Sequence, residues 1–108
     1  MPTPPPSTKT SLAQRLSARA RTAWPQLASV HVRHRGAFAY ADGELPGGDV
    51  IKLMRLPYGG SASTWGFALY LASTDTYQDT LLPTGTFAGT PEDALDCACG
   101  LYLTGPDL

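Results

Sequence analysis

Apolar residues near the start of the chain recur every three or four positions, which is the spacing of one face of a helix. They are Leu12, Leu16, Ala20, Ala23 and Leu27. The pattern predicts a helix over Ser11–Trp24, which Pro25 ends because proline disfavours helical geometry in the residue before it. Residues 1–9 include four prolines and predict an extended, disordered tail.

The middle of the chain alternates apolar runs with glycine- and proline-rich turns, which is typical of antiparallel strands. The predicted strands are Val30–Ala41, Val50–Leu56, Trp65–Ala72 and, as a short fourth strand or an irregular return, Asp75–Leu82. Gly36 is expected to bend the first strand, and residues 42–48 are expected to turn the chain into the second. In the first strand, Val30, Val32, Phe38 and Tyr40 are expected on one side and His31, Arg33 and Arg35 on the other.

A second helix is predicted near the end of the chain. It begins at the run Thr90-Pro91-Glu92-Asp93. Threonine caps a helix, proline suits its first position, and the helix dipole favours carboxylates in its first turn. The helix is predicted to run to about Leu103. Its expected buried stripe is Ala94, Leu95, Ala98, Leu101 and Tyr102.

Residues 10–105 are therefore expected to form a single α+β domain. Its predicted architecture is a two-layer sandwich of an N-terminal helix, an antiparallel sheet of three to four strands and a C-terminal helix. Short connections make sequential strands antiparallel. Since each helix has one apolar stripe, both helices are expected to cover the same face of the sheet and leave the other face open.

Charge is divided unevenly along the chain. Residues 1–41 hold six bases and no acid, whereas residues 56–108 hold six acids and no base, and the formal net charge is −1. The basic half is either an anion-binding surface or is neutralised by the acidic half on folding, and the sequence leaves both interpretations open. No apolar run reaches the length of a membrane span and no signal-peptide pattern is present, so we expect a cytoplasmic protein without a membrane partner.

The candidate reactive groups do not form a catalytic or metal-binding pattern. Cys97 and Cys99 are two residues apart, so on a helix they point in different directions, and we expect Cys97 in the core and Cys99 partly exposed. His31 and His34 are expected on opposite faces of a strand, which prevents them from sharing a metal ion. We therefore expect a non-catalytic protein without metal or cofactor, with a thiol-dependent enzyme as the alternative.

The open face of the sheet is the predicted functional surface. Its predicted partner-binding residues are Met54, Leu56, Tyr58 and Tyr70. An exposed apolar patch of this kind favours a protein partner or a homodimer. The cations expected on the same face are His31, Arg33, Arg35 and Lys52. Because cations hold phosphates and tyrosines stack on bases, nucleic-acid binding through these cations and the tyrosines is the alternative function.

Four short segments also carry resemblances to known families. They are Tyr-Gly-Gly at 58–60, Trp-Gly-Phe-Ala-Leu-Tyr at 65–70, Leu-Pro-x-Gly at 82–85 and Gly-Thr-Pro-Glu-Asp-Ala-Leu-Asp-Cys-Ala at 89–98. Together they resemble a group of short uncharacterised proteins of high-GC actinobacteria, and the absence of asparagine agrees with a high-GC origin.

The predicted strands and the run Gly-Thr-Pro-Glu-Asp-Ala are also similar to HicB-type antitoxins, which implies a small regulatory protein that binds a partner. The order of helix, three strands and helix resembles double-stranded-RNA-binding domains as well. Those domains have lysines at the start of the last helix. Glu92, Asp93 and Asp96 stand there in this chain, and they would repel phosphates.

Overall fold

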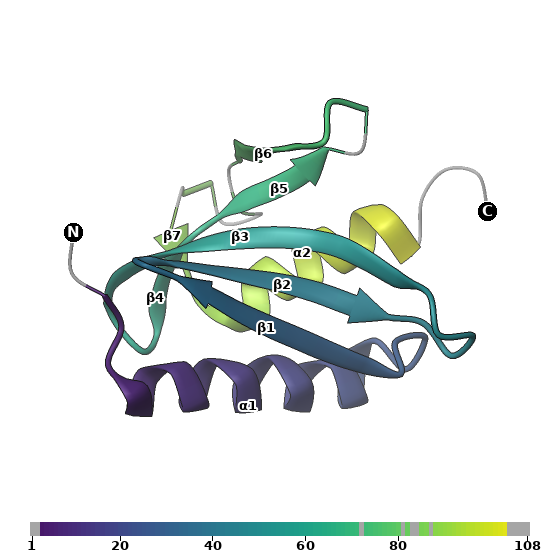
Figure 1. The fold of residues 1–108 in the computed structure, drawn as a ribbon, viewed down its shortest axis with the longest axis horizontal. Coiled ribbons are helices and arrows are strands. Elements are labelled where there is room, and N and C mark those ends of the chain that lie inside the picture. Colours follow the sequence, from purple (N-terminus) through teal and green to yellow (C-terminus); the bar gives the residue numbers. More distant parts are fainter. Residues whose placement is uncertain (1–2, 72, 81, 83–84, 87, 104–108) are drawn as a thin grey trace.

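The computed structural model describes residues 3–71, 73–80, 82, 85–86 and 88–103. The elements are α1 (Pro6–Ala23), β1 (Ser29–Arg35), β2 (Phe38–Glu44), β3 (Val50–Ser61), β4 (Thr64–Gly66), β5 (Ala68–Leu71), β6 (Thr76–Asp79), β7 (Ala88–Gly89) and α2 (Pro91–Leu103). This arrangement confirms the predicted α+β layout of an N-terminal helix, an antiparallel sheet and a C-terminal helix (Figure 1). The sheet has more strands than predicted.

The long strand β3 organises the sheet. The strands β1, β2, β3, β4 and β7 follow one another in space, while β5 pairs with β3 beyond the end of β4, and β6 pairs with β5. Every pairing is antiparallel. Among the described residues, β1 pairs only with β2 and β6 only with β5, so these two strands form opposite edges of the sheet.

A tight turn divides the first predicted strand into β1 and β2. Gly36 has φ +60°, and Arg35 pairs directly with Phe38, so Gly36 and Ala37 form a two-residue hairpin loop. Glycine at the first loop position is the requirement of one of the two favoured hairpin turns. The prediction of a bent strand was wrong, and so was the predicted side of Phe38 and Tyr40. The turn brings Tyr40 opposite Arg33, on the face away from the helices.

A β-bulge changes the side-chain parity of β3. Ala41 pairs with Met54, but the next residue of β2, Asp42, pairs with Lys52, so Leu53 is an extra residue in the ladder. An extra residue reverses which side chains face the core. Leu53 and Met54 are consequently both buried, whereas Lys52 remains exposed.

Both helices pack on one side of the sheet, α1 against β1 and α2 against β3, and they also contact each other (Figure 1). The core between the layers comprises Leu12, Leu16, Ala20, Leu27, Ala39, Ala41, Leu53, Met54, Leu56, Trp65, Phe67, Leu69, Leu82, Ala94, Leu95, Ala98 and Cys99. The predicted stripe of α1 is therefore in the core at Leu12, Leu16 and Ala20. The helix begins earlier than predicted, at Pro6, since proline is tolerated at the first helical position.

The second helix begins as predicted but turns a slightly different face to the core. Thr90 Oγ1 accepts a hydrogen bond from the backbone N–H of Asp93 at 3.2 Å, which is the predicted cap. Leu101 is 51% exposed, contrary to its predicted burial, and Tyr102 has a side chain outside the described part of the structure. The two cysteines are also reversed from the prediction, with Cys99 fully buried and Cys97 half-buried.

Candidate functional site on the open face of the sheet

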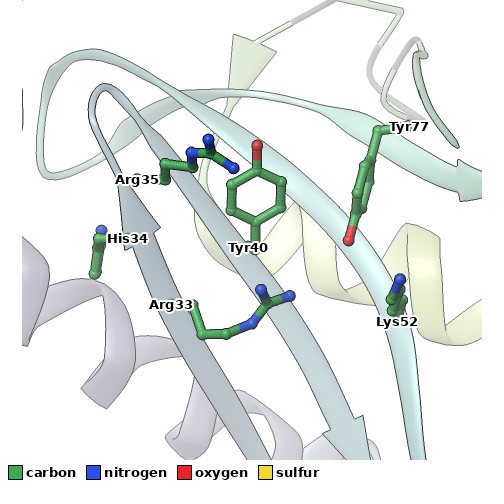
Figure 2. Close-up of a pocket in the computed structure, with 6 residues that line it drawn as sticks. All are labelled: Arg33, His34, Arg35, Tyr40, Lys52 and Tyr77. Atoms are coloured by element: carbon green, nitrogen blue, oxygen red, sulfur yellow. The ribbon is translucent and has the colours of Figure 1, made fainter.

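The open face, meaning the side of β1, β2, β3, β5 and β6 turned away from both helices, carries a connected group of aromatic rings and cations. The members of this tyrosine–cation cluster are Arg33, Phe38, Tyr40, Lys52, Arg55, Tyr70 and Tyr77. Figure 2 shows Arg33, Tyr40, Lys52 and Tyr77 in front of the strands, with the helices behind them.

The rings of the cluster contact one another across the strands. The centroid of Tyr77 lies 5.3 Å from that of Tyr40 and 5.3 Å from that of Tyr70, with tilted or edge-on ring planes. Such pairs contribute about 0.5–1.5 kcal/mol beyond the area they bury. Three strands, β2, β5 and β6, thus supply one continuous aromatic surface.

The cations of the cluster lie over these rings. Arg33 is 5.4 Å from the centroid of Tyr40, and Lys52 is 5.3 Å from that of Tyr70. Arg55 lies 4.9 Å from the ring centroid of Phe38 and also contacts Tyr77. Cation–π contacts hold these flexible side chains in place.

Each of these cations also has an acidic neighbour on the same face. The ion pairs are Arg33–Asp42 at 3.2 Å, Lys52–Asp75 at 3.5 Å and Arg55–Asp79 at 3.8 Å, with His31–Glu44 at 2.7 Å beside them. Arg35 is exposed and has no ion pair within the described residues. The open face is therefore nearly neutral, and most of its cations already have counter-ions.

Contacts on this face shift the pKa values of Asp75, Arg33 and Tyr77. Tyr70 donates a hydrogen bond to Asp75 at 2.6 Å, and this bond, together with the charge of Lys52, lowers the pKa of Asp75. The hydrogen bond to Asp42 raises the pKa of Arg33, while burial and then the charge of Asp42 raise the pKa of Tyr77. Near neutral pH, Asp75 is thus ionised and Tyr77 neutral.

A hollow of about 430 Å³ lies within this surface (Figure 2). It is lined by Arg33, His34, Arg35, Tyr40, Lys52 and Tyr77. The carboxylate of Asp42 is only 13% exposed and bonds Arg33, so an internal anion already occupies part of this cationic environment. An external anion would have to compete with Asp42.

The structure separates the predicted site residues into two groups. His31, Arg33, Arg35, Lys52 and Tyr70 belong to the elements and parity that form the open face. Met54 and Leu56 are fully buried, so their predicted exposure was wrong, because the bulge turns them toward the helices. Tyr58 is half-buried and lies 5.3 Å from the ring of Trp65, as part of the core edge.

Sequence reasoning missed Tyr40, Arg55 and Tyr77. A bend at Gly36 predicts Tyr40 on the side opposite Arg33, whereas the two-residue turn places both on one side. The position of Arg55 on the open face depends on the bulge, and the sequence of β3 contains no local signal for that bulge. Gly36, which lies between the two alternating segments of β1 and β2, is the sequence signal that indicates the hairpin.

The basic residues of α1 are neutralised by the acidic residues of α2. Arg15 donates two hydrogen bonds to the carboxylate of Glu92, at 2.8 and 2.7 Å. Arg19 donates two to Asp96, at 3.0 and 2.6 Å, and Trp24 Nε1 donates a third at 2.8 Å. Of the two interpretations of the charge division, the structure supports neutralisation on folding for these arginines.

The remaining reactive groups do not form a site. Burial, followed by the charge of Asp96, raises the pKa of Cys99 to about 12, and burial raises that of Cys97. Since the thiolate is the nucleophile, neither thiol is activated. His31 and His34 lie on opposite sides of β1, and the described residues contain no group of three or more side chains that could hold a metal ion. None of the described helices is long and apolar enough to cross a membrane.

No protein-family model, curated protein or solved structure matches this chain.

Proposed function

We propose that this protein is a small, non-catalytic binding module that docks another protein chain on the open face of its sheet. The observation that carries the proposal is the tyrosine–cation cluster, in which three tyrosines from three strands contact each other under paired cations. The proposal includes a cytoplasmic location, which the two free cysteines support.

The chemistry of the cluster resembles that of a protein interface. Tyrosine and arginine are enriched at the centres of such interfaces, where they contribute much of the binding energy. The contacts between Tyr40, Tyr77 and their neighbours already restrict these side chains, so little side-chain entropy remains to be lost on binding. The resemblance of the strands and of the run Gly-Thr-Pro-Glu-Asp-Ala at 89–94 to HicB-type antitoxins agrees with a partner-binding role.

The second candidate is single-stranded nucleic acid, which the hollow beside the unpaired Arg35 favours. The charge balance argues against it. Arg33 and Lys52 each have a carboxylate neighbour, so few cations are available to replace the counter-ions of phosphates. About two phosphate contacts would give a log–log salt slope near −1.4, which is weak for this class of protein. We expect no binding of labelled oligonucleotides in about 0.15 M salt, measured by fluorescence anisotropy.

The test of the proposed function is site-specific photo-crosslinking in the cells that make the protein. A photoreactive phenylalanine analogue replaces Tyr77 at the centre of the cluster, and a matched control carries it at Gln14, an exposed residue of α1. We expect discrete protein adducts from position 77 only, and their loss when Arg33→Glu is added to a chain that still folds. Absence of adducts at position 77, or equal adducts at both positions, would overturn the proposal.

A further inference from the structure

We infer that the occupant of the open face is a second copy of this chain, related by a two-fold axis that runs along the strands. In this arrangement β1 of one copy lies against the β5–β6 hairpin of the other. The inference rests on the proposed function and names its partner.

The first support is the charge gradient across the open face. The edge strand β1 contributes Arg33, whose side chain is 57% exposed, and the unpaired Arg35, and it contains no acid. The opposite edge contributes Asp75 and Asp79, each 73% exposed, and no base. Exposed carboxylates of this kind retain lone pairs for further hydrogen bonds. The face is therefore positive at one edge, negative at the other and aromatic between them.

The second support is the register of the sheet. Successive cross-strand partners run Arg33, Tyr40, Arg55, Ala68 and Asp79, so that the cation of one edge and the acid of the other stand in the same row. A two-fold axis parallel to the strands places each edge of one copy opposite the other edge of the second copy. The position along the strands is unchanged, so residues of this row face the same row of the second copy. It places Arg33 of each copy opposite Asp79 of the other, and both contacts are equivalent by symmetry.

The charges favour this axis over a two-fold axis perpendicular to the strands. A two-fold axis perpendicular to the strands would place β1 on β1 and set Arg33 and Arg35 against their own copies. Like charges facing each other across an interface are unfavourable. In the selected arrangement, Arg55 lies closest to the axis. Its guanidinium lies over the ring of Phe38 and beside Asp79, so its charge is compensated within each copy.

The size of the face limits the strength of the pairing. The face spans five strands about 4.8 Å apart, of which four have four or seven residues and β3 has 12, part of which extends beyond the face. At about 3.4 Å per residue, this gives an area near 500 Å² per copy. The total of about 1,000 Å² is at the lower limit for a specific interface. We therefore expect a dimer in equilibrium with monomer, with a dissociation constant on the order of 10 μM that rises with salt.

Charge exchange tests the arrangement. One variant carries Arg33→Glu with Arg35→Glu, and the other carries Asp79→Lys with Asp75→Asn, since asparagine tolerates the φ of +51° at Asp75. Sedimentation velocity up to about 0.5 mM, roughly fifty times the expected dissociation constant, gives the association state. Circular dichroism verifies that each variant folds, and Arg21→Glu on the exposed side of α1 is the matched control.

We expect the wild type and the Arg21→Glu control to dimerise, and each charge variant alone to bind itself at least about tenfold more weakly. An equimolar mixture of the two charge variants should dimerise within about threefold of the wild type, because both edge contacts become attractive again.

A wild type that stays monomeric, charge variants that dimerise normally, or folded variants whose mixture stays monomeric would each overturn the inference. A mixture that dimerises more strongly than the wild type would also overturn it. That result would favour the perpendicular axis, in which β1 of one copy lies on β1 of the other. If the wild type is monomeric but position 77 still forms adducts with other proteins, the docking function stands and only the self-pairing fails.

Discussion

The ion pair between Arg15 and Glu92 provides a measurable test of how the two helices are held together. Glu92→Gln keeps the shape of the side chain but removes its charge and one of its two acceptor oxygens. Arg15 would then lose its two-bond partner and keep the carbonyl of Ala62 at 3.0 Å and the hydroxyl of Ser63 at 3.2 Å. Asp93→Asn is the matched control, because both acids lie in the first turn of α2.

The expected magnitude follows from the burial of the pair. The side chains of Arg15 and Glu92 are 27% and 32% exposed. Fully exposed pairs contribute about 0.2–1 kcal/mol, whereas breaking a buried pair costs about 3–5 kcal/mol. A mostly buried pair with two charge-assisted hydrogen bonds falls between, near 1.5 kcal/mol. Loss of the dipole interaction adds about 0.5 kcal/mol in both variants. Glu92→Gln should therefore cost about 2 kcal/mol and Asp93→Asn about 0.5 kcal/mol.

The pH dependence gives the prediction a second test. Hydrogen bonds from Arg15 lower the pKa of Glu92 despite its partial burial. A carboxyl with a lowered folded-state pKa stabilises the fold above its unfolded pKa, near 4.3, and this stability is lost as the pH falls through the folded pKa. The gap in the free energy of unfolding between wild type and Glu92→Gln should thus be complete at pH 7 and close toward about pH 2.

Urea unfolding followed by tryptophan fluorescence measures both quantities, with Trp24 and Trp65 as reporters. Our reasoning would be refuted if Glu92→Gln and Asp93→Asn cost the same at pH 7. It would also be refuted if the Glu92→Gln gap at about pH 2 equalled that at pH 7, since a protonated carboxyl cannot form the ion pair.

Two further predictions concern the core. Met54→Glu should unfold the domain and abolish the near-ultraviolet circular dichroism, because it places a carboxylate at a fully buried position at a cost of more than about 4 kcal/mol; a folded variant would show that β3 lacks the bulge. Cys99 should resist alkylation at about pH 8 in the native protein and react in urea, as measured by mass spectrometry, since burial raises its pKa to about 12. Rapid native modification of Cys99 would contradict its placement.

The sequence predicted the features that depend on neighbouring residues. The cap at Thr90 and the stripe of Leu12, Leu16 and Ala20 follow from helical spacing and from the first-turn residues alone, and the structure has both. The two-helix, antiparallel-sheet layout followed from the same patterns and the short connections between elements.

The composition of the open face could not be predicted, because it depends on pairing between distant residues. The extra residue in β3 exists only relative to β2, because it arises where Ala41 pairs with Met54 and Asp42 pairs with Lys52. A shift of one residue exchanges the two faces of a strand, so Met54 moved to the core and Arg55 to the surface. Tyr77 joins the cluster only because the short strand β6 pairs with β5.

A ribosome makes α1 before α2, yet Arg15 and Arg19 of α1 bond residues of α2 that lie 77 positions further along the chain. While synthesis continues, α1 can contact β1 but not α2, so the stripe of Leu12 and Leu16 is covered only in part. The contacts that complete the domain are also those with the greatest loop entropy to overcome, which slows folding. Closure of the domain therefore requires α2, and a chain released before α2 is made would expose the apolar stripe of α1 to chaperones and proteases.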